Sequence, residues 1–300
     1  MRDAFANELF LLAEKDKSIE LLTGDLGFGV LRPFQENMPD RFHNVGIAEQ
    51  LLIEMATGMA LSGKKVVCYS IGNFPVFRCL EQIRNDAAYS GADVKIVAIG
   101  GGYTYGELGM SHNALEDIAV LRPIPSIAIY TPCDKVEAVL VTDLMMKRKG
   151  TTYLRLERPD PAVLHDAPIK NYVEGRPLQI MAGTKCAVVS YGSIALTAKE
   201  VALKKGYAFY TFPMLKPLDE KWITKELGQY RRLVVIEEHS VIGGLASALE
   251  AIFADQEKCP SIKSFGVPDL VSPVVGSQEY LRDKAGLSLK KILLRLEEKD

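Results

Sequence analysis

The sequence predicts an α/β protein of two domains, each a mainly parallel sheet with crossover helices. Short runs rich in β-branched residues alternate with longer stretches of helical periodicity, a pattern typical of parallel sheets. The chain has 300 residues, more than one domain usually contains. A stretch rich in Pro and Gly over 159–183 interrupts the alternation. We therefore expect a first domain over 1–166, a linker over 167–184 and a second domain over 185–300.

The first half is expected to open with an amphipathic helix within residues 1–20, because charged side chains interrupt its apolar ones. An apolar segment over 51–63 predicts a buried helix, and shorter helical runs cover 80–86 and 114–121. Each of the first four strand candidates, from 20–22 to 126–130, is followed by Gly, Pro, Asp or Asn. Loops at the carboxyl ends of parallel strands are where α/β proteins bind ligands. The strand candidates are 20–22, 65–70, 94–99, 126–130 and 151–157.

The second half repeats the alternation. Helices are expected over 195–205 and 244–253. The strand candidates are 186–191, 208–212, 233–237 and 262–265.

Charge and cysteine content exclude several classes of protein. The 36 Lys and Arg nearly cancel the 38 Asp and Glu, so nucleic acid is a poor candidate partner. No apolar run is long enough to span a membrane. The five cysteines are scattered without the paired spacing of a metal site or a disulfide framework. We expect buried free thiols, no metal ligands and a reducing, cytoplasmic location.

Glu49 is the first candidate for a chemical role, because it lies in the first turn of the helix predicted to be buried. One interpretation is a carboxylate placed there by its favourable interaction with the positive end of the helix. The other is a carboxyl group at a buried junction, where loss of solvent lets it share a proton with a ligand. The residues alone leave both interpretations open.

Two neighbouring segments favour the second interpretation. Phe74 and Phe77 follow a predicted strand, although aromatic side chains are more often core than ligand platforms. A glycine-rich loop over 100–113 follows the strand at 94–99, and so many glycines imply that its backbone approaches something closely. His112 at the end of this loop is a candidate acid or base.

These features resemble a known family when they are taken together. The closest match is the carboxyl-terminal half of a split transketolase. The pyrimidine-binding domain of thiamine diphosphate enzymes in the transketolase family is similar to GIAEQ (46–50), the aromatic segment before EQIR (81–84), SHNALEDIAVLRPIP (111–125) and IYTPCD (129–134). The family's carboxyl-terminal domain is similar to SYGS (190–193), FPMLKPLD (212–219) and VVIEEHSVIGGL (234–245).

The resemblance implies a thiamine diphosphate site at a subunit interface, used to transfer a two-carbon ketol unit from a ketose to an aldehyde sugar. It implies that Glu49 hydrogen-bonds the aminopyrimidine of the cofactor. Phe74 is the preferred stacking residue and Phe77 the second choice. Asp25 and Leu26 match positions that pack against the cofactor.

The resemblance also implies substrate contacts. His112 matches a histidine near the reacting carbon, whereas Arg158 and, less surely, Arg2 match positions that bind a sugar phosphate. A surface cation is an equally good interpretation of Arg2. Three family side chains are replaced by apolar ones, which favours a larger or less polar acceptor, such as a modified or nucleotide-linked sugar. The replacing residues are Leu108 for an aspartate, Gly100 for a histidine and Gly29 for a serine.

A complete transketolase also binds Mg²⁺ and the diphosphate through a G-D-G motif, and Gly24-Asp25-Leu26 does not match it. We therefore expect an amino-terminal partner subunit that carries the Mg²⁺ ligands, in an α2β2 assembly. The alternatives are the beta subunit of a 2-oxo acid dehydrogenase, a catalytically silent interaction subunit and, more remotely, a flavin or nicotinamide redox subunit. For Glu237, Glu238 and His239 we expect a structural or interface role, and for His165 no special role.

Overall fold

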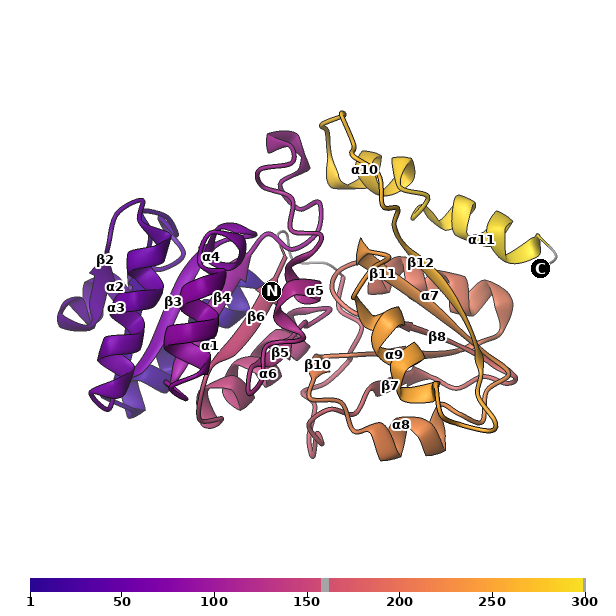
Figure 1. The fold of residues 1–300 in the computed structure, drawn as a ribbon, viewed down its shortest axis with the longest axis horizontal. Coiled ribbons are helices and arrows are strands. Elements are labelled where there is room, and N and C mark those ends of the chain that lie inside the picture. Colours follow the sequence, from indigo (N-terminus) through magenta and orange to yellow (C-terminus); the bar gives the residue numbers. More distant parts are fainter. Residues whose placement is uncertain (158–161, 299–300) are drawn as a thin grey trace.

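The structure, a computed structural model, describes residues 1–157 and 162–298. It has two halves side by side, each built on one sheet (Figure 1). The first sheet has seven strands, in the spatial order β10 (Met214–Lys216), β5 (Ala128–Tyr130), β6 (Thr152–Leu156), β4 (Val94–Ile99), β3 (Lys65–Ile71), β1 (Ile19–Thr23) and β2 (Phe42–Asn44). The second has five, in the order β12 (Ser261–Val267), β11 (Arg232–Ser240), β8 (Cys186–Ser190), β9 (Ala208–Thr211) and β7 (Leu178–Met181).

Helices cover both faces of the first sheet. Helices α1 (Arg2–Lys15) and α6 (Lys135–Lys147) pack together on one face, and α3 (Glu49–Leu61) packs with the π-helix η2 (Gln82–Ala88) on the other. Successive side chains of β3 alternate between these two apolar clusters, which explains why its interior is entirely buried. The shorter helices of this half are α2 (Arg32–Asn37), η1 (Pro39–Arg41), α4 (Phe74–Phe77), η3 (Gly106–Leu108) and α5 (Asp117–Leu121).

The second sheet is covered in the same way. Helix α7 (Ala195–Lys205) contacts α11 (Leu289–Glu297) and packs on one face, whereas α9 (Leu245–Phe253) packs on the other. Helix α8 (Glu220–Glu226) lies beside α9, and α10 (Gln278–Lys284) precedes α11. None of the helices among the described residues is both long and apolar enough to cross a membrane.

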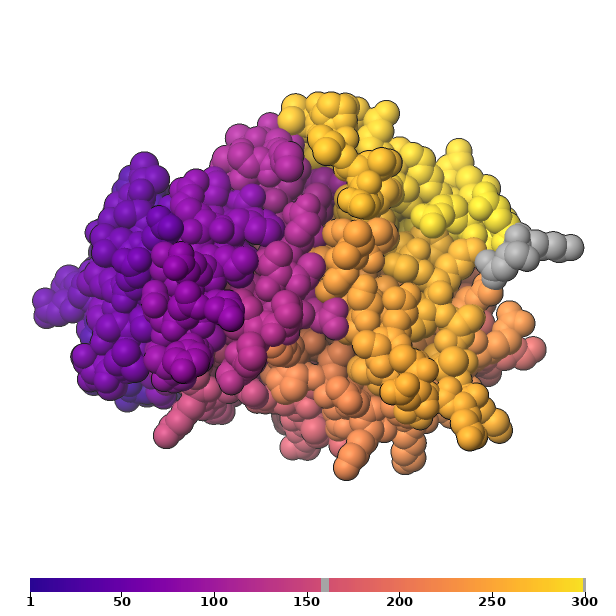
Figure 2. Space-filling view, in the orientation of Figure 1, coloured from indigo at the N-terminus to yellow at the C-terminus, as the bar shows by residue number. Residues whose placement is uncertain are grey.

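Strand β10 and the segment before α10 are two of the places where the halves meet. Strand β10 follows the second-half strand β9 in the chain but pairs antiparallel with β5 of the first sheet. The segment before α10 reaches back to the glycine-rich loop, where the Gly276 amide donates to the Gly106 carbonyl at 3.3 Å. Figure 2 shows this loop and the carboxyl-terminal segment in contact at the top of the molecule. The second half therefore contacts the glycine-rich loop of the first half and helps to hold it in place.

The structure confirms most of the expected elements. The strand at 94–99 and the helix at 195–205 have the predicted bounds, and the mainly parallel two-sheet architecture is as expected. Strand β7 was not predicted, and it lies within the expected linker over 167–184 and pairs antiparallel with β9. A short edge strand is compatible with the surrounding Pro and Gly residues, which therefore do not exclude one.

Two other differences have physical causes. Strands β2 and β10 were not predicted, since each has three residues and so no measurable alternation. The helix expected to be buried is α3, and it is buried only where it meets the sheet. Leu51 and Leu61 at its two ends are exposed. Its outer face presents these two leucines beside the exposed Gln50 and Glu54.

Candidate active site

The site is built around Glu49, the first residue of α3. The short strand β2 leads into this helix, and the junction places the Glu49 side chain against the core with only 4% of its surface exposed. Its Oε2 accepts from the Arg78 guanidinium at 2.7 Å. Arg78 is half exposed, at 49%, so the pair joins a buried carboxylate to a cation at the protein surface.

Arg78 also contacts the aromatic segment predicted to be part of the site. It follows α4, the single turn that begins at Phe74 directly after β3, so Phe74 and Arg78 are four residues apart on one helical face. The Arg78 guanidinium carbon lies 4.8 Å from the centroid of the Phe74 ring, within the range of a cation–π contact. Phe77 at the end of the same turn is exposed. Arg78 therefore contacts both Phe74 and Glu49 and links the two side chains.

His112 lies on the other side of Phe74. The two ring centroids are 5.1 Å apart with the planes at 70°, and Tyr105 approaches His112 edge-on from the glycine-rich loop at 6.5 Å. His112 Nδ1 is 3.0 Å from the Ser111 hydroxyl oxygen. Because β3 and β4 are neighbours, the segments that follow them meet at one edge of the sheet. Glu49, Phe74 and His112 thus form one group from three separate segments.

Sequence reasoning missed Arg78 as a member of this group. The spacing of Phe74 and Arg78 within one helical turn was a usable signal. The ion pair with Glu49 had no such signal, because the two residues are 29 positions apart and meet only when α4 packs against α3.

Three of the other predicted residues make their hydrogen bonds elsewhere among the described residues. Asp25 follows β1, has a left-handed φ of 57°, and exchanges hydrogen bonds with the Asn44 side chain. The Leu26 carbonyl accepts a hydrogen bond from the Thr23 hydroxyl at 2.9 Å. Arg2 lies at the start of α1 and donates from Nε to Asp3 at 2.8 Å, with 31% of its side chain exposed. Arg158 lies outside the described residues.

The glycine-rich loop is fixed by the second half of the protein. The Tyr103 amide donates to Oε1 of the buried Glu238 at 2.6 Å, and Glu238 in turn pairs with Arg282 and accepts from Gln278 on α10. Gly102 has a φ of +65°, and a Cβ at this position would overlap the Glu238 carboxylate. A glycine is therefore required where the loop passes over Glu238.

Replacing Gly102 with alanine should destabilise the protein. The left-handed conformation alone costs an L-residue about 1–2 kcal/mol, and the overlap with Glu238 adds to this. Gly150→Ala is the matched control, because Gly150 has a φ of +88° but open space around its Cβ position. In urea unfolding, Gly102→Ala should lower the midpoint more than Gly150→Ala does. Equal losses would show that the contact with Glu238 places no steric demand on Gly102.

A cleft of about 600 Å³ opens beside the group, between the glycine-rich loop and the second half. Phe77 and Met110 line one side, and Ile242 and Leu270 line the other. Asn73 and Asn113 also line it, and neither of their buried side-chain oxygens has a hydrogen-bond partner among the described residues. The cleft is therefore lined mainly by apolar side chains, together with two asparagines.

Comparison with known families divides the chain into two parts. Residues 1–162 match the model described as the pyrimidine-binding domain of transketolase. Residues 176–292 match the model described as the transketolase C-terminal domain.

Characterised relatives and a solved structure are similar over nearly the whole chain. An apulose-4-phosphate transketolase subunit from Phocaeicola vulgatus is 33% identical, with 89% of this chain and 87% of that protein covered. The 6-deoxy-6-sulfo-D-fructose transketolase subunit of Clostridium sp. strain MSTE9 is 31% identical, with 98% and 92% covered. A structure titled "Split gene transketolase, inactive beta4 tetramer" has a TM-score of 0.87 at 28% identity, with 99% of this chain and 96% of that chain covered.

Proposed function

This chain belongs to the transketolase family, and from that premise we propose that it is one subunit of a split transketolase. With a partner chain, it would use thiamine diphosphate to transfer a two-carbon ketol unit from a ketose to an aldehyde sugar. The observation that carries this proposal is the group of Glu49, Phe74 and His112, which has a buried carboxylate beside an aromatic ring and an imidazole.

The residues of this group fit the aminopyrimidine of the cofactor. Bound thiamine diphosphate supplies a nucleophilic carbon, which proteins lack among their own side chains. Glu49 would hold a proton at the ring nitrogen N1' of the cofactor, in a site from which most water is excluded. Phe74 would pack against the ring face, and His112 would donate a hydrogen bond to a substrate oxygen.

Arg78 sets a condition on cofactor binding. Its guanidinium donates a hydrogen bond to Glu49 Oε2. It would have to move away when a nitrogen of the cofactor forms a hydrogen bond with that oxygen. Because the Arg78 side chain is half exposed, it can turn toward solvent without moving α3. Arg78 would then hold the Glu49 carboxylate in place until the cofactor binds.

A partner chain would complete the site. The relatives are named as subunits, and the similar split-gene structure is titled an inactive tetramer of beta chains. Exposed apolar side chains also surround the site, and such patches mark protein interfaces. These are Ile47, Leu51, Leu108, Met110, Leu270 and Val271. We propose an α2β2 assembly in which this face meets the amino-terminal subunit.

The Mg²⁺ ligands are proposed to lie on that partner. The described residues contain one group with metal-ligand spacing, and it includes a cysteine and a histidine. Mg²⁺ prefers oxygen ligands in octahedral geometry, so this group does not suit it. The diphosphate and its cation would therefore be bound by the partner, whereas this chain would bind the pyrimidine.

The acceptor is proposed to be larger or less polar than a simple pentose phosphate. Leu108 and Met110 are exposed on the glycine-rich loop, and Met110 lines the cleft. An apolar loop offers little to the hydroxyl groups of a small sugar. A modified sugar or a nucleotide-linked sugar has additional surface to contact it.

Reconstitution tests the proposed function. The chain should be purified alone and together with a candidate amino-terminal subunit, and each sample supplied with thiamine diphosphate, Mg²⁺, ketose donors and a panel of aldehyde acceptors. We expect ketol transfer from the complex and none from the single chain. Turnover of pyruvate or branched oxo acids in place of ketoses would instead indicate a 2-oxo acid dehydrogenase subunit. Full activity of this chain alone, or activity with pentose phosphate acceptors only, would contradict the partner and acceptor proposals respectively.

A further inference from the structure

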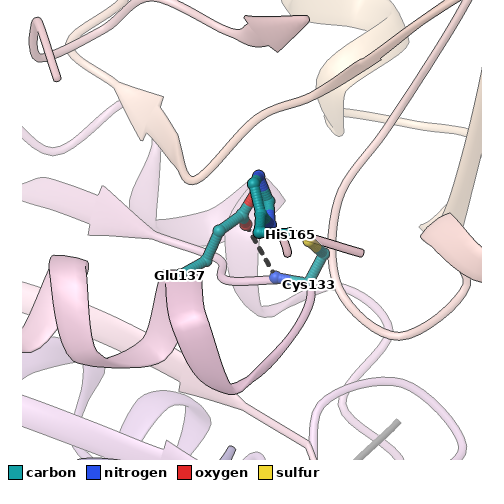
Figure 3. Close-up of side chains that lie close together, drawn as sticks. All are labelled: Cys133, Glu137 and His165. Atoms are coloured by element: carbon teal, nitrogen blue, oxygen red, sulfur yellow. Dashed lines mark hydrogen bonds and ion pairs between the residues drawn. The ribbon is translucent and has the colours of Figure 1, made fainter. Parts of the chain in front are cut away.

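A second cluster of chemically reactive side chains lies away from the Glu49 group, where residues 162–177 between β6 and β7, here called the connector, meet the start of α6. Cys133 precedes this helix, Glu137 lies in its first turn, and His165 belongs to the connector (Figure 3). The cysteine sulfur, a carboxylate oxygen and a ring nitrogen all lie within 4.8 Å of one another. Cys133 and Glu137 are completely buried, and the His165 side chain is 11% exposed.

The hydrogen bonds around Asp134 determine which nitrogen of His165 carries the proton. Asp134 caps α6, and its Oδ1 accepts from the Val136 and Glu137 amides at 2.9 Å. Its Oδ2 accepts from the Leu164 amide at 2.7 Å and lies 3.1 Å from His165 Nδ1. Because the same Oδ2 accepts from both the Leu164 and the His165 amides, we assign Nδ1 as the donor in this contact.

The other nitrogen of His165 is left without a partner. In the neutral ring, Nε2 carries a lone pair, and it makes no hydrogen bond to the described residues. Oε1 of Glu137 lies 3.5 Å from it. A ring lone pair and a carboxylate oxygen therefore face each other in a buried site, and the Cys133 thiol lies beside them. Such a pair requires a proton or a metal cation between its two acceptors.

We propose that Cys133, Glu137 and His165 bind a Zn²⁺ ion or a similar thiophilic divalent cation. Sulfur, imidazole nitrogen and carboxylate oxygen are the ligands that Zn²⁺ takes in proteins, and a water can fill the fourth position. The hydrogen bond from His165 to Asp134 is the outer contact that typically orients a metal-binding histidine. Binding would release the thiol proton of Cys133 to solvent.

A bound ion would join three parts of the chain. Cys133 and Glu137 belong to the first half and His165 to the connector. Glu137 Oε1 also accepts from the Thr211 hydroxyl of β9, in the second half, at 2.5 Å. The ion would thus stabilise the junction between the halves, independently of the proposed function. The positions 133, 137 and 165 do not have the paired spacing of a known metal motif, so the sequence alone does not indicate this site.

Metal binding by the chain tests this proposal. The experiment uses a tag-free chain with Cys259→Ala, because Cys259 is an exposed thiol that could bind metal elsewhere. After treatment with a chelator and its removal, the protein is dialysed against Zn²⁺ and its metal content measured by mass spectrometry. In parallel, Co²⁺ is added and its absorbance recorded. We expect one ion per chain, a thiolate-to-cobalt charge-transfer band and a higher unfolding temperature with Zn²⁺.

Variants locate the ion. Cys133→Ala and His165→Gln should weaken binding at least tenfold and remove the thiolate band or shift the cobalt spectrum, respectively. Cys68→Ala, which removes a buried thiol within the first half, should bind as the parent does. Circular dichroism of each metal-free variant confirms that it is folded. Absence of stoichiometric binding, or binding equal in Cys133→Ala and Cys68→Ala, would overturn the proposal and leave a proton between His165 and Glu137.

Discussion

Replacing Glu49 with glutamine should lower kcat of the reconstituted enzyme by about 10²- to 10⁴-fold, the usual contribution of a positioned acid or base. Glutamine has nearly the same shape and can still hydrogen-bond a ring nitrogen, but it cannot exchange a proton with it. The Glu49 side chain is 4% exposed, so water cannot easily take over that exchange. Steady-state kinetics with saturating cofactor would measure the effect, and a cofactor titration would show whether binding is retained.

The control is Glu54→Gln on the same helix. Glu54 is exposed, and its Oε1 is 3.5 Å from the Gln82 side chain, so the change removes one charge from α3 without touching the group. Its kcat should stay within about twofold of the parent, as expected for a surface substitution. If Glu49→Gln and Glu54→Gln have equal activity, Glu49 has no catalytic role and the chain is an interaction subunit.

The sequence was most informative where one segment determines its own structure. The six residues of β4 are bounded by Asp93 and Gly100, and both ends were predicted correctly. Local pattern placed Glu49 in the first turn of a helix that packs on the sheet but left its burial open, and the structure shows the side chain buried. The family resemblance extended this to the architecture of both halves, which the structure confirms.

Contacts between distant segments could not be predicted in the same way. Arg78 reaches Glu49 only because α4 packs on α3, and nothing in either segment specifies that approach. Strand β10 joins the first sheet although it follows the second-half strand β9 in sequence, so its place depends on how the halves dock. The same holds for Glu238, which lies 135 residues from Tyr103 and supports the loop that carries His112.

Arg155 lies where the two halves meet, because it donates a hydrogen bond to the carbonyl of Glu238. Replacing it with methionine should destabilise the protein more than replacing Gly102 with alanine. Its side chain is 1% exposed and donates from Nε to Asp117 Oδ2 at 3.0 Å. One NH₂ group donates to the carbonyl of Ala114 at 2.8 Å and to that of Glu238 at 2.9 Å. Burial alone would lower the pKa of Arg155, but Asp117 and the neighbouring acidic groups raise it on balance, so the guanidinium stays charged.

Methionine fills much of the same space but leaves the Asp117 charge buried without its cation. Loss of one partner of a buried pair costs about 3–5 kcal/mol, so the urea midpoint should fall sharply. Arg176→Met is the matched control, because Arg176 also donates from Nε to a carboxylate, Asp219, at 2.7 Å, but its side chain is 40% exposed. Solvent screens that exposed pair, so its loss should lower the urea midpoint far less than the loss of the buried pair.

A second substitution identifies the cause of the loss. In the double variant Arg155→Met with Asp117→Asn, the uncompensated charge is gone while the Tyr153 hydroxyl, which bonds Asp117 at 2.6 Å, keeps an oxygen to donate to. The double variant should therefore recover part of the stability that Arg155→Met loses, which a thermodynamic cycle of the four proteins would measure. If Arg155→Met costs no more than Arg176→Met, the buried Arg155–Asp117 pair does not contribute more to stability than an exposed pair. A large loss with no recovery in the double variant would instead assign the effect to the carbonyls of Ala114 and Glu238, which lose their donor in both variants.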